Sequence, residues 1–294
     1  MKGRPDNIKI RHVILFINPM KKHALELGEK IKADLGVLKI NADIFIVDEK
    51  SKFNTPKKYD IAISLGGDGT VLFAARTMSP LGIPVFPVNL GTFGFIAGIQ
   101  SEQWREVFEL YINGKVPLSS RLMIGIKIER KGIEVINRCC LNEVVISASG
   151  KVKLINLNVS CKIDDNIFTL GSYRSDGLIV STPTGSTGYS FSAGGPILDP
   201  ELEALILNPI CPFALSARPM VLPAEETIIV EVDKEQRSDV YLTVDGQISE
   251  KLKSGDRIFL QKAPYYCMLV KSGRSGFYDT LATKFIWMGG SRSC

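Results

Sequence analysis

Histidine is nearly absent from this chain, which has only two, His12 and His23, among its 294 residues. Neither lies near a serine or cysteine that could act as a nucleophile, so the sequence argues against a Ser/His/Asp or Cys/His hydrolase. The six cysteines include no C-x-x-C pair, and two histidines leave a zinc site almost without ligands. Carboxylates must therefore carry any acid–base chemistry.

Long apolar runs are missing as well. The run at residues 13–17 is too short for the core of a signal peptide, and no segment approaches the ~20 apolar residues of a membrane span. We therefore expect a cytoplasmic protein without a membrane partner. The 36 basic and 31 acidic residues give a net charge of +5, which suits a small anionic ligand but is too mild to predict binding of nucleic acid.

A glycine-rich stretch early in the chain carries the strongest signal. Residues 61–65 (IAISL) are uncharged and predict a strand that is buried on both faces. Three of the next four residues are glycines, which predict a tight turn whose backbone N–H groups are open to a phosphate. Thr70 is expected to cap a helix at residues 71–78.

One carboxylate, Asp68, lies among these glycines. It would repel a bare anion, so the arrangement makes sense if Asp68 holds a metal ion or accepts a proton from a hydroxyl. That is the chemistry of phosphoryl transfer. The stretch is neither a Walker A loop nor a complete dinucleotide fingerprint. Taken alone, a G-G-x-G sequence is as often an ordinary turn between a strand and a helix.

Strands and helices alternate up to residue 117. Short apolar runs predict the strands, and apolar stripes at helical spacing predict the helices. This alternation predicts a doubly wound, Rossmann-like α/β domain that binds ligands at the carboxyl ends of its strands. The expected strands are residues 13–17, 42–47, 61–65 and 83–88, and the expected helices are 20–35, 71–78 and 104–111, the last capped by Ser101.

Beyond residue 117 the pattern changes to short strands. Residues 155–163 alternate between apolar and polar side chains, which a half-buried strand requires and a helix cannot use. Similar strands separated by turn sequences predict a mostly β, β-sandwich-like domain, and they fall at 121–129, 228–232, 240–244 and 258–260. A helical stripe returns at 276–287. We therefore expect an α/β domain at 1–117, a β-rich domain at 118–275, and a C-terminal helix at 276–294 that packs on the first domain.

A second polar cluster lies in the β-rich part. The segment 177–198 has no charged residue. Its hydroxyls and glycine backbone could recognise a ribose and a base edge, although its composition fits an unspecialised loop equally well. Asn142 and Glu143 could pair with an adenine edge and a ribose, or form the polar end of a strand. Arg174 and Asp176 could likewise be an ordinary ion pair.

These motifs occur together in the order seen in NAD kinases, and the chain is similar to that family over nearly its whole length. They are LGGDGT at 65–70, NLGTFGF at 89–95, Asn142-Glu143, and DGLIVSTPTGSTGYSFSAGGP at 176–196, the most specific. The resemblance implies transfer of the γ-phosphoryl group of ATP to the adenosine 2′-hydroxyl of NAD. It also implies Mg²⁺ with ATP, which neutralises the charge of the transferred group, and a homodimer or homotetramer.

The resemblance also assigns roles to single residues. Asp68 is the expected catalytic residue, which deprotonates or orients the 2′-hydroxyl. We expect direct in-line transfer, because no nucleophile with an adjacent base is found. The residues implied for the phosphates of ATP are Gly66, Gly67, Gly69 and Thr70. The residues implied for NAD are Asp68, Gly69, Phe73, Asn142, Glu143, Arg174, Asp176, Thr184, Thr187, Gly188, Tyr189, Ser190, Ser192 and Gln247.

Two other functions stay open at this point. A kinase for a lipid or a sugar could share the glycine loop, but it would have no use for the uncharged segment 177–198. A non-catalytic NAD sensor would bind the dinucleotide and release no product from ATP. The carboxylate of Asp68 within an intact loop argues against the sensor.

Overall fold

The computed structural model describes residues 8–48, 51, 53–54, 57–91, 94–149, 154–271 and 276–285. The chain divides into two compact units, which we call unit 1 (Met1–Ser119 with Met268–Cys294) and unit 2 (Ser120–Cys267). It returns to unit 1 at Met268, before the boundary after residue 275 that the sequence pattern predicted. The reason is strand β19 (Cys267–Val270), which pairs in parallel with β4 (Val85–Asn89) in the sheet of unit 1.

The sheet of unit 1 is built around strand β3 (Ile61–Gly66), which is buried along its whole length. Besides β4 and β19, its other strands are β1 (His12–Ile17), β2 (Asn41–Ile46), β5 (Ile99–Gln100) and β6 (Leu118–Arg121). The order is β2-β1-β3-β4-β19-β6, with β5 on β4, and β1 to β4 run parallel. Buried β3 lies beside β1, where the strand order reverses and doubly wound folds bind ligands.

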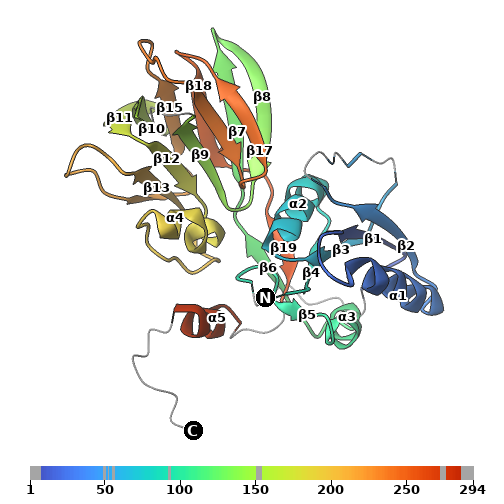
Figure 1. Ribbon diagram of the computed structural model, residues 1–294. Coiled ribbons are helices and arrows are strands. Elements are labelled where there is room, and N and C mark those ends of the chain that lie inside the picture. Colours follow the sequence, from blue (N-terminus) through green and yellow to red (C-terminus); the bar gives the residue numbers. More distant parts are fainter. Residues whose placement is uncertain are drawn as a thin grey trace, which may run out of the picture. The chain divides into compact units, whose positions relative to one another are not determined.

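Helices α1 (Ala24–Val37), α2 (Asp68–Met78) and α3 (Trp104–Ile112) cover both faces of this sheet. Figure 1 shows α2 on one side and α1 and α3 on the other. Ile31 of α1 and Phe108 of α3 share a buried cluster with Leu15 of β1. The next residue, Phe16, faces the opposite way, and its ring centroid lies 5.5 Å from that of Phe73 in α2. The predicted doubly wound domain is confirmed.

Two predicted helix caps are wrong. Gly67 is the N-cap of α2, with an extended backbone (φ −111°, ψ −167°), and Thr70 lies inside the first turn. Glycine is only slightly weaker than serine or threonine as an N-cap, so the helix starts earlier and places a carboxylate in its first turn. The N-cap of α3 is Gln103. The Ser101 hydroxyl instead donates to Glu102 Oε1 at 2.6 Å.

Unit 2 consists of two antiparallel sheets. The first has the order β11-β10-β15-β18-β7-β8 and contains β7 (Ile124–Arg130), β8 (Ile133–Cys140), β10 (Ile155–Ile163), β11 (Asn166–Ser175), β15 (Thr227–Val232) and β18 (Arg257–Lys262). The second has the order β14-β13-β12-β9-β16-β17 and contains β9 (Glu143–Ala148), β12 (Gly177–Ser181), β13 (Ala204–Ile210), β14 (Met220–Pro223), β16 (Val240–Val244) and β17 (Ile248–Leu252). Ile126 of β7 shares one buried cluster with Val144 of β9 and Leu178 of β12, so the sheets pack face to face.

The strand predicted at residues 121–129 is two strands. β6 ends at Arg121 in the sheet of unit 1, and β7 begins at Ile124 in unit 2. Leu122 and Met123 between them are 2% and 0% exposed. Because both linking residues are apolar and buried, the sequence pattern runs through the break without a turn signal.

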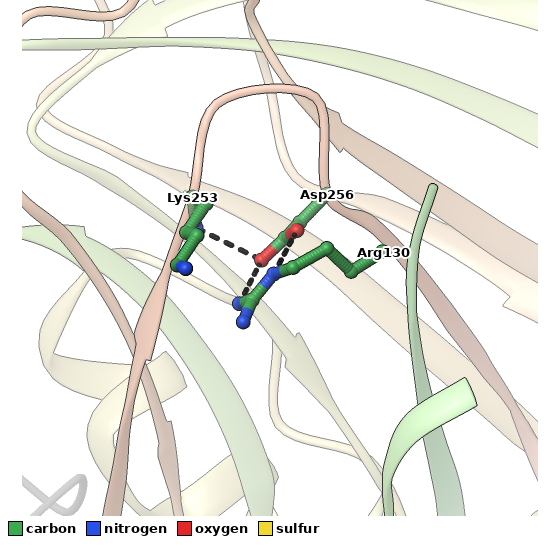
Figure 2. Close-up of polar contacts among 3 residues, drawn as sticks. All are labelled: Arg130, Lys253 and Asp256. Atoms are coloured by element: carbon green, nitrogen blue, oxygen red, sulfur yellow. Dashed lines mark hydrogen bonds and ion pairs between the residues drawn. The ribbon is translucent and has the colours of Figure 1, made fainter. Parts of the chain in front are cut away.

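A partly buried ion pair fastens the turn before β18. Asp256 is 1% exposed, and it accepts hydrogen bonds from Nε and Nη2 of Arg130 at 2.8 and 2.7 Å (Figure 2). The backbone N–H of Lys253 donates to the same carboxylate at 2.8 Å. A two-pronged guanidinium–carboxylate pair is among the strongest polar contacts in proteins. It ties the end of β7 to the turn that leads into its sheet neighbour, β18.

The predicted C-terminal helix is present as α5 (Gly276–Phe285), and residues 286–287 of the prediction lie outside the described part of the chain. It contacts Phe95 of unit 1: the ring of Phe277 lies 6.3 Å from that of Phe95, and Lys284 Nζ lies 4.8 Å from the Phe95 ring centroid. Within the described residues, no helix combines the length and apolar character needed to cross a membrane.

Candidate active site

The glycine loop lies at the carboxyl edge of the parallel sheet in unit 1. The N–H of Asn18 donates to Leu65 O at 3.1 Å, and the N–H of Leu90 donates to Gly66 O at 2.9 Å. The ends of β1, β3 and β4 are therefore tied together side by side. Asp68 begins α2 at this edge, which is where a doubly wound fold places its ligand-binding loops.

Three backbone N–H groups hold the carboxylate of Asp68. Phe95 donates to Oδ2 at 3.1 Å, and Ile96 and Ala97 donate to Oδ1 at 3.2 and 2.9 Å. The donors follow β4 and lie 27, 28 and 29 positions further along the chain. The negative charge also lies at the N-terminus of a helix, where the helix dipole favours it. The protein itself thus holds this carboxylate in one orientation.

The four residues expected to bind ATP phosphates lie in two environments. Gly67 and Gly69 are accessible at the start of α2, whereas Gly66 and Thr70 are buried. A Cβ on Gly66 would lie 2.9 Å from Cβ of Thr70, so the threonine packs directly over that glycine. The Thr70 hydroxyl has no hydrogen-bond partner among the described residues. Gly67 and Gly69 therefore form the surface that the loop can offer to a phosphate.

Phe73 lies in the core of unit 1. It is 9% exposed, and its ring centroid lies 5.5 Å from that of Phe16 and 6.0 Å from that of Phe45, on which it stacks. These contacts pack α2 against the sheet. The contact of Phe73 with NAD that the resemblance implies stays a prediction.

In unit 2 the carboxylate of Asp245 organises residues 141–143. It is 5% exposed and accepts the N–H groups of Leu141, Asn142 and Glu143 at 3.2, 2.8 and 3.2 Å. Gln247 follows the same turn, between β16 and β17. The sequence did not reveal this role of Asp245, because its partners lie 104, 103 and 102 positions away.

Three buried polar atoms around these residues have no hydrogen-bond partner in the described part of the chain: Asn142 Oδ1, Glu143 Oε2 and Thr184 Oγ1. A Cβ on Gly188 would lie 3.1 Å from Glu143 Oε2 and 3.6 Å from Asn142 Nδ2, so both side chains lie against that glycine. Buried polar groups are normally paired. The unpaired atoms of the two side chains that lie against Gly188 therefore indicate a place for a polar ligand.

Glu143 is 6% exposed. Burial, and then the negative charge of Asp245, raise the pKa of Glu143 from 4.5 to about 8. The carboxyl group is therefore mostly protonated at neutral pH. A protonated carboxyl group donates one hydrogen bond and still accepts others, so it suits a ligand that carries both kinds of group.

The uncharged segment 177–198 is built into the fold. It contains β12, the 3₁₀ turn η2 (Thr184–Thr187) and the short helix α4 (Tyr189–Ser192). Thr182 Oγ1 donates to Leu141 O at 2.6 Å, and Ser186 Oγ donates to Pro183 O at 2.7 Å. Several of its hydroxyls therefore hold backbone in place, whereas the buried Thr184 hydroxyl has no partner among the described residues and is open to a ligand.

The short helix α4 is hydrogen-bonded to strand β13. Nδ2 of the buried Asn208 donates to O and Oγ of Ser190 at 3.0 and 3.3 Å. Tyr189 and Ser192 are exposed, and Thr187 Oγ1 donates to Thr184 O at 3.4 Å. Sequence reasoning did not single out Asn208. The available signal was a lone asparagine in an otherwise apolar strand, where it needs a buried partner.

Arg174 and Asp176 are not part of the group around Glu143. β12 separates them: it begins at Gly177, beside Asp176, and its last residue, Ser181, pairs with Glu143. Four residue steps at ~3.3 Å each give roughly 13 Å of strand. Within unit 2 the structure therefore brings together only some of the residues expected at one dinucleotide site.

No group of three or more His, Cys, Asp or Glu side chains that could hold a metal ion occurs in the described part of the chain. Asp68 is the single carboxylate of the glycine loop. One carboxylate suits a Mg²⁺ ion that arrives with nucleotide phosphates, since Mg²⁺ keeps several waters and uses only one or two protein carboxylates.

Comparison with known proteins decides the family. Residues 14–116 match the ATP-NAD kinase N-terminal domain, and residues 141–272 match the ATP-NAD kinase C-terminal domain. The chain belongs to the NAD kinase family. The NAD kinase of Treponema denticola is 40% identical over 285 residues, which are 96% of this chain and 98% of that protein. The NAD kinase of Aquifex aeolicus is 36% identical over 280 residues, or 95% and 100% of the two chains.

Solved structures of the NAD kinase family share the fold. An NAD kinase from Archaeoglobus fulgidus, solved in complex with ATP, is 26% identical with a TM-score of 0.69, covering 93% of this chain and 98% of its own. Yeast NADH kinase, solved with NADH, has a TM-score of 0.85 at 23% identity. The match covers 98% of this chain and 91% of the yeast chain. At that identity the likeness concerns the fold alone. The expected α/β unit followed by an antiparallel β unit is thereby confirmed.

Proposed function

We propose that this NAD kinase family member transfers the γ-phosphoryl group of ATP to the 2′-hydroxyl of the adenosine ribose in NAD, giving NADP and ADP. The observation that carries the proposal is that Asn142, Glu143 and Thr184 each have a buried polar atom without a partner among the described residues. An asparagine can pair with an adenine edge through two hydrogen bonds. A protonated carboxyl group and a hydroxyl suit the ribose, which both donates and accepts.

Asp68 is the proposed catalytic residue. Its carboxylate accepts a hydrogen bond from the 2′-hydroxyl and takes its proton as the new bond to the γ-phosphorus forms. The bond from the γ-phosphorus to the β–γ bridging oxygen breaks, and ADP leaves with its electron pair. Oδ2 accepts one of the three backbone bonds and Oδ1 accepts two. Oδ2 therefore has the lone pair left for the hydroxyl.

The reaction needs no covalent enzyme intermediate. Positioning of the two substrates and neutralisation of phosphate charge carry the catalysis. Mg²⁺ enters as the MgATP substrate and supplies that neutralisation. Gly67 and Gly69 are the proposed contacts of the phosphates in the loop, because they are the accessible ones.

The test is incubation of the purified protein with Mg²⁺, ATP and NAD, read out with a dehydrogenase specific for NADP. Formation of NADP in amounts stoichiometric with ADP is expected. NAD that raises the melting temperature without yielding NADP would replace the proposal with a sensor. Consumption of ATP only with a lipid or sugar acceptor would replace it with another kinase.

We further propose that the remaining residues implied by the resemblance contact NAD, and that the protein acts in the cytoplasm as a homodimer or homotetramer. Alanine at Arg174 or Asp176 is expected to raise KM for NAD with little change in kcat, because such contacts serve binding. Light scattering on the eluting peak of a sizing column measures the mass of the assembly directly, and a mass of one chain would reject the oligomer.

A further inference from the structure

We propose that Gly94 is a positioning residue, whose missing side chain leaves the space in which the carboxylate of Asp68 is held. This inference rests on the proposed function, because it concerns the carboxylate that is assigned there to the 2′-hydroxyl of NAD. Gly94 lies in the loop after β4, 26 positions from Asp68 in the printed sequence.

The space at Gly94 is filled by Asp68. A Cβ on Gly94 would lie 2.7 Å from Cγ of Asp68 and 2.9 Å from its Oδ2, and closer still to its Oδ1. Carbon atoms in favourable contact are ~3.5–4.0 Å apart, so a Cβ and this carboxylate cannot keep both positions. The φ of Gly94 lies outside the left-handed region. Alanine would therefore strain no backbone here, and the requirement is for space alone.

Gly94 also begins the segment that binds the carboxylate. The N–H groups of the next three residues donate to Asp68. A methyl group at position 94 would push the carboxylate away from these donors, and hydrogen bonds to a charged acceptor are strongly geometry-dependent. We call Gly94 and the three donors, Phe95, Ile96 and Ala97, the Asp68 cradle.

The cradle is held in place, so the side chain of Asp68 is the part that has to move. Ile96 and Ala97 are 7% and 0% exposed. Phe95 is contacted from α5, whose Lys284 Nζ lies 4.8 Å from its ring centroid. A carboxylate at the end of a rotatable side chain shifts more easily than packed backbone. The substitution is therefore expected to misplace Asp68 without unfolding unit 1.

The first experiment compares Gly94→Ala with wild type in the NADP-forming assay. We expect kcat to fall about 100-fold, the effect of moving a reacting group by ~1 Å, while KM for NAD and the melting temperature stay close to wild type. Gly91→Ala is the matched control in the same loop. A Cβ there would meet nothing nearer than Lys21 Nζ at 3.6 Å, so wild-type kinetics are expected. A wild-type kcat for Gly94→Ala would overturn the proposal.

A double mutant separates positioning from a general structural role. Asp68→Ala removes the carboxylate and empties the space, so adding Gly94→Ala to it should cause no further loss of kcat. If the two losses multiply instead, Gly94 acts independently of Asp68 and the proposal is wrong.

Hydrogen exchange provides a readout that needs neither substrate nor a folded Gly94 variant. The N–H groups of Ile96 and Ala97 should exchange faster in Asp68→Ala than in wild type, because they lose their acceptor. Unchanged exchange would overturn the proposal. If the wild type makes no NADP, the proposed function fails, and this measurement still decides whether the cradle exists.

Discussion

Asp68 of unit 1 and Glu143 of unit 2 are the two carboxyl groups that the proposed function uses, and the protein surrounds them in opposite ways. Asp68 accepts three backbone N–H groups. Glu143 is 6% exposed, its Oε2 has no partner among the described residues, and the neighbouring Asp245 adds a negative charge. Donors fix a carboxylate as an acceptor, whereas burial without donors keeps a carboxyl group protonated. The difference suits the proposed roles, in which Asp68 accepts a proton and the protonated Glu143 donates a hydrogen bond to the ligand.

The comparison teaches that backbone N–H groups, rather than the residue type, decide what a carboxyl group does here. Asp245 makes the point within unit 2, because it is as buried as Glu143 but accepts three backbone N–H groups. Asp256 shows a third solution, in which a guanidinium group replaces two of the backbone donors (Figure 2). Each of these groups can be changed to test the contrast.

Asp68→Asn removes the acceptor for a proton and should have the largest effect. We expect kcat to fall roughly 10²- to 10⁴-fold, the usual contribution of a general base, with binding of NAD largely kept. Turnover in the NADP assay and calorimetric titration with NAD measure the two quantities. Turnover close to wild type would leave Asp68 with a structural role only.

Arg130→Met would remove two of the three hydrogen bonds that Asp256 accepts, so this buried carboxylate would become poorly paired, as Glu143 is. Asp256 would stay buried with the backbone N–H of Lys253. We expect a loss of about 3 kcal/mol in the free energy of unfolding, because the buried carboxylate of Asp256 loses its charged partner. Arg138→Met is the control: its ion pair with Glu250 has an N–O distance of 3.7 Å and is half exposed. The free energy of unfolding of that variant, measured by urea denaturation, should fall by less than about 1 kcal/mol.

Glu143→Gln keeps the shape of the protonated carboxyl group and removes its titration. Because the pKa is raised from 4.5 to about 8, the folded protein binds a proton that the unfolded chain has already lost between these pH values. Stability of the wild type therefore falls as pH rises across this range, by up to ~1.4 kcal/mol per pH unit. The variant should match wild type near pH 4.5 and exceed it at pH 8.5. Parallel stability curves over this range would refute the assignment.

Asp245→Asn should have the smallest and most specific effect. Removing this charge removes one of the two causes that raise the pKa of Glu143. In the variant, the fall in stability with rising pH should therefore end at a lower pH than in wild type. Replacing one carboxylate oxygen also costs the bond from the N–H of Leu141, so an additional pH-independent loss of about 1–2 kcal/mol is expected. An unchanged end point would leave burial alone responsible for the pKa of Glu143.

Much of the fold could be predicted from local patterns. The uncharged run at 61–65 became the buried strand β3, and the alternation at 155–163 became β10 with the predicted limits. Strand and helix periodicities are local properties, so they survive in a single sequence. The break between β6 and β7 at Leu122 and Met123 could not be predicted in this way, because an apolar link between two sheets has the same local pattern as a strand.

The candidate site could be located by its motifs but not described by them. The glycine loop and the Asn142-Glu143 pair were found in the sequence, and the comparisons place both within domains of the NAD kinase family. The Asp68 cradle and the bonds of Asp245 were not found. Their donors are backbone N–H groups, which every residue except proline carries, so no residue type marks them.

The sequence by itself determined the family, the order of an α/β part and a β part, and which carboxyl groups are available for chemistry. Those properties depend on composition, periodicity and motif order. Only the tertiary structure decided that Asp68 is held by amides 27 to 29 positions away and that Oε2 of Glu143 is buried without a partner among the described residues. Hydrogen bonding and burial depend on which distant segments the fold brings together, and burial beside Asp245 raises the pKa of Glu143.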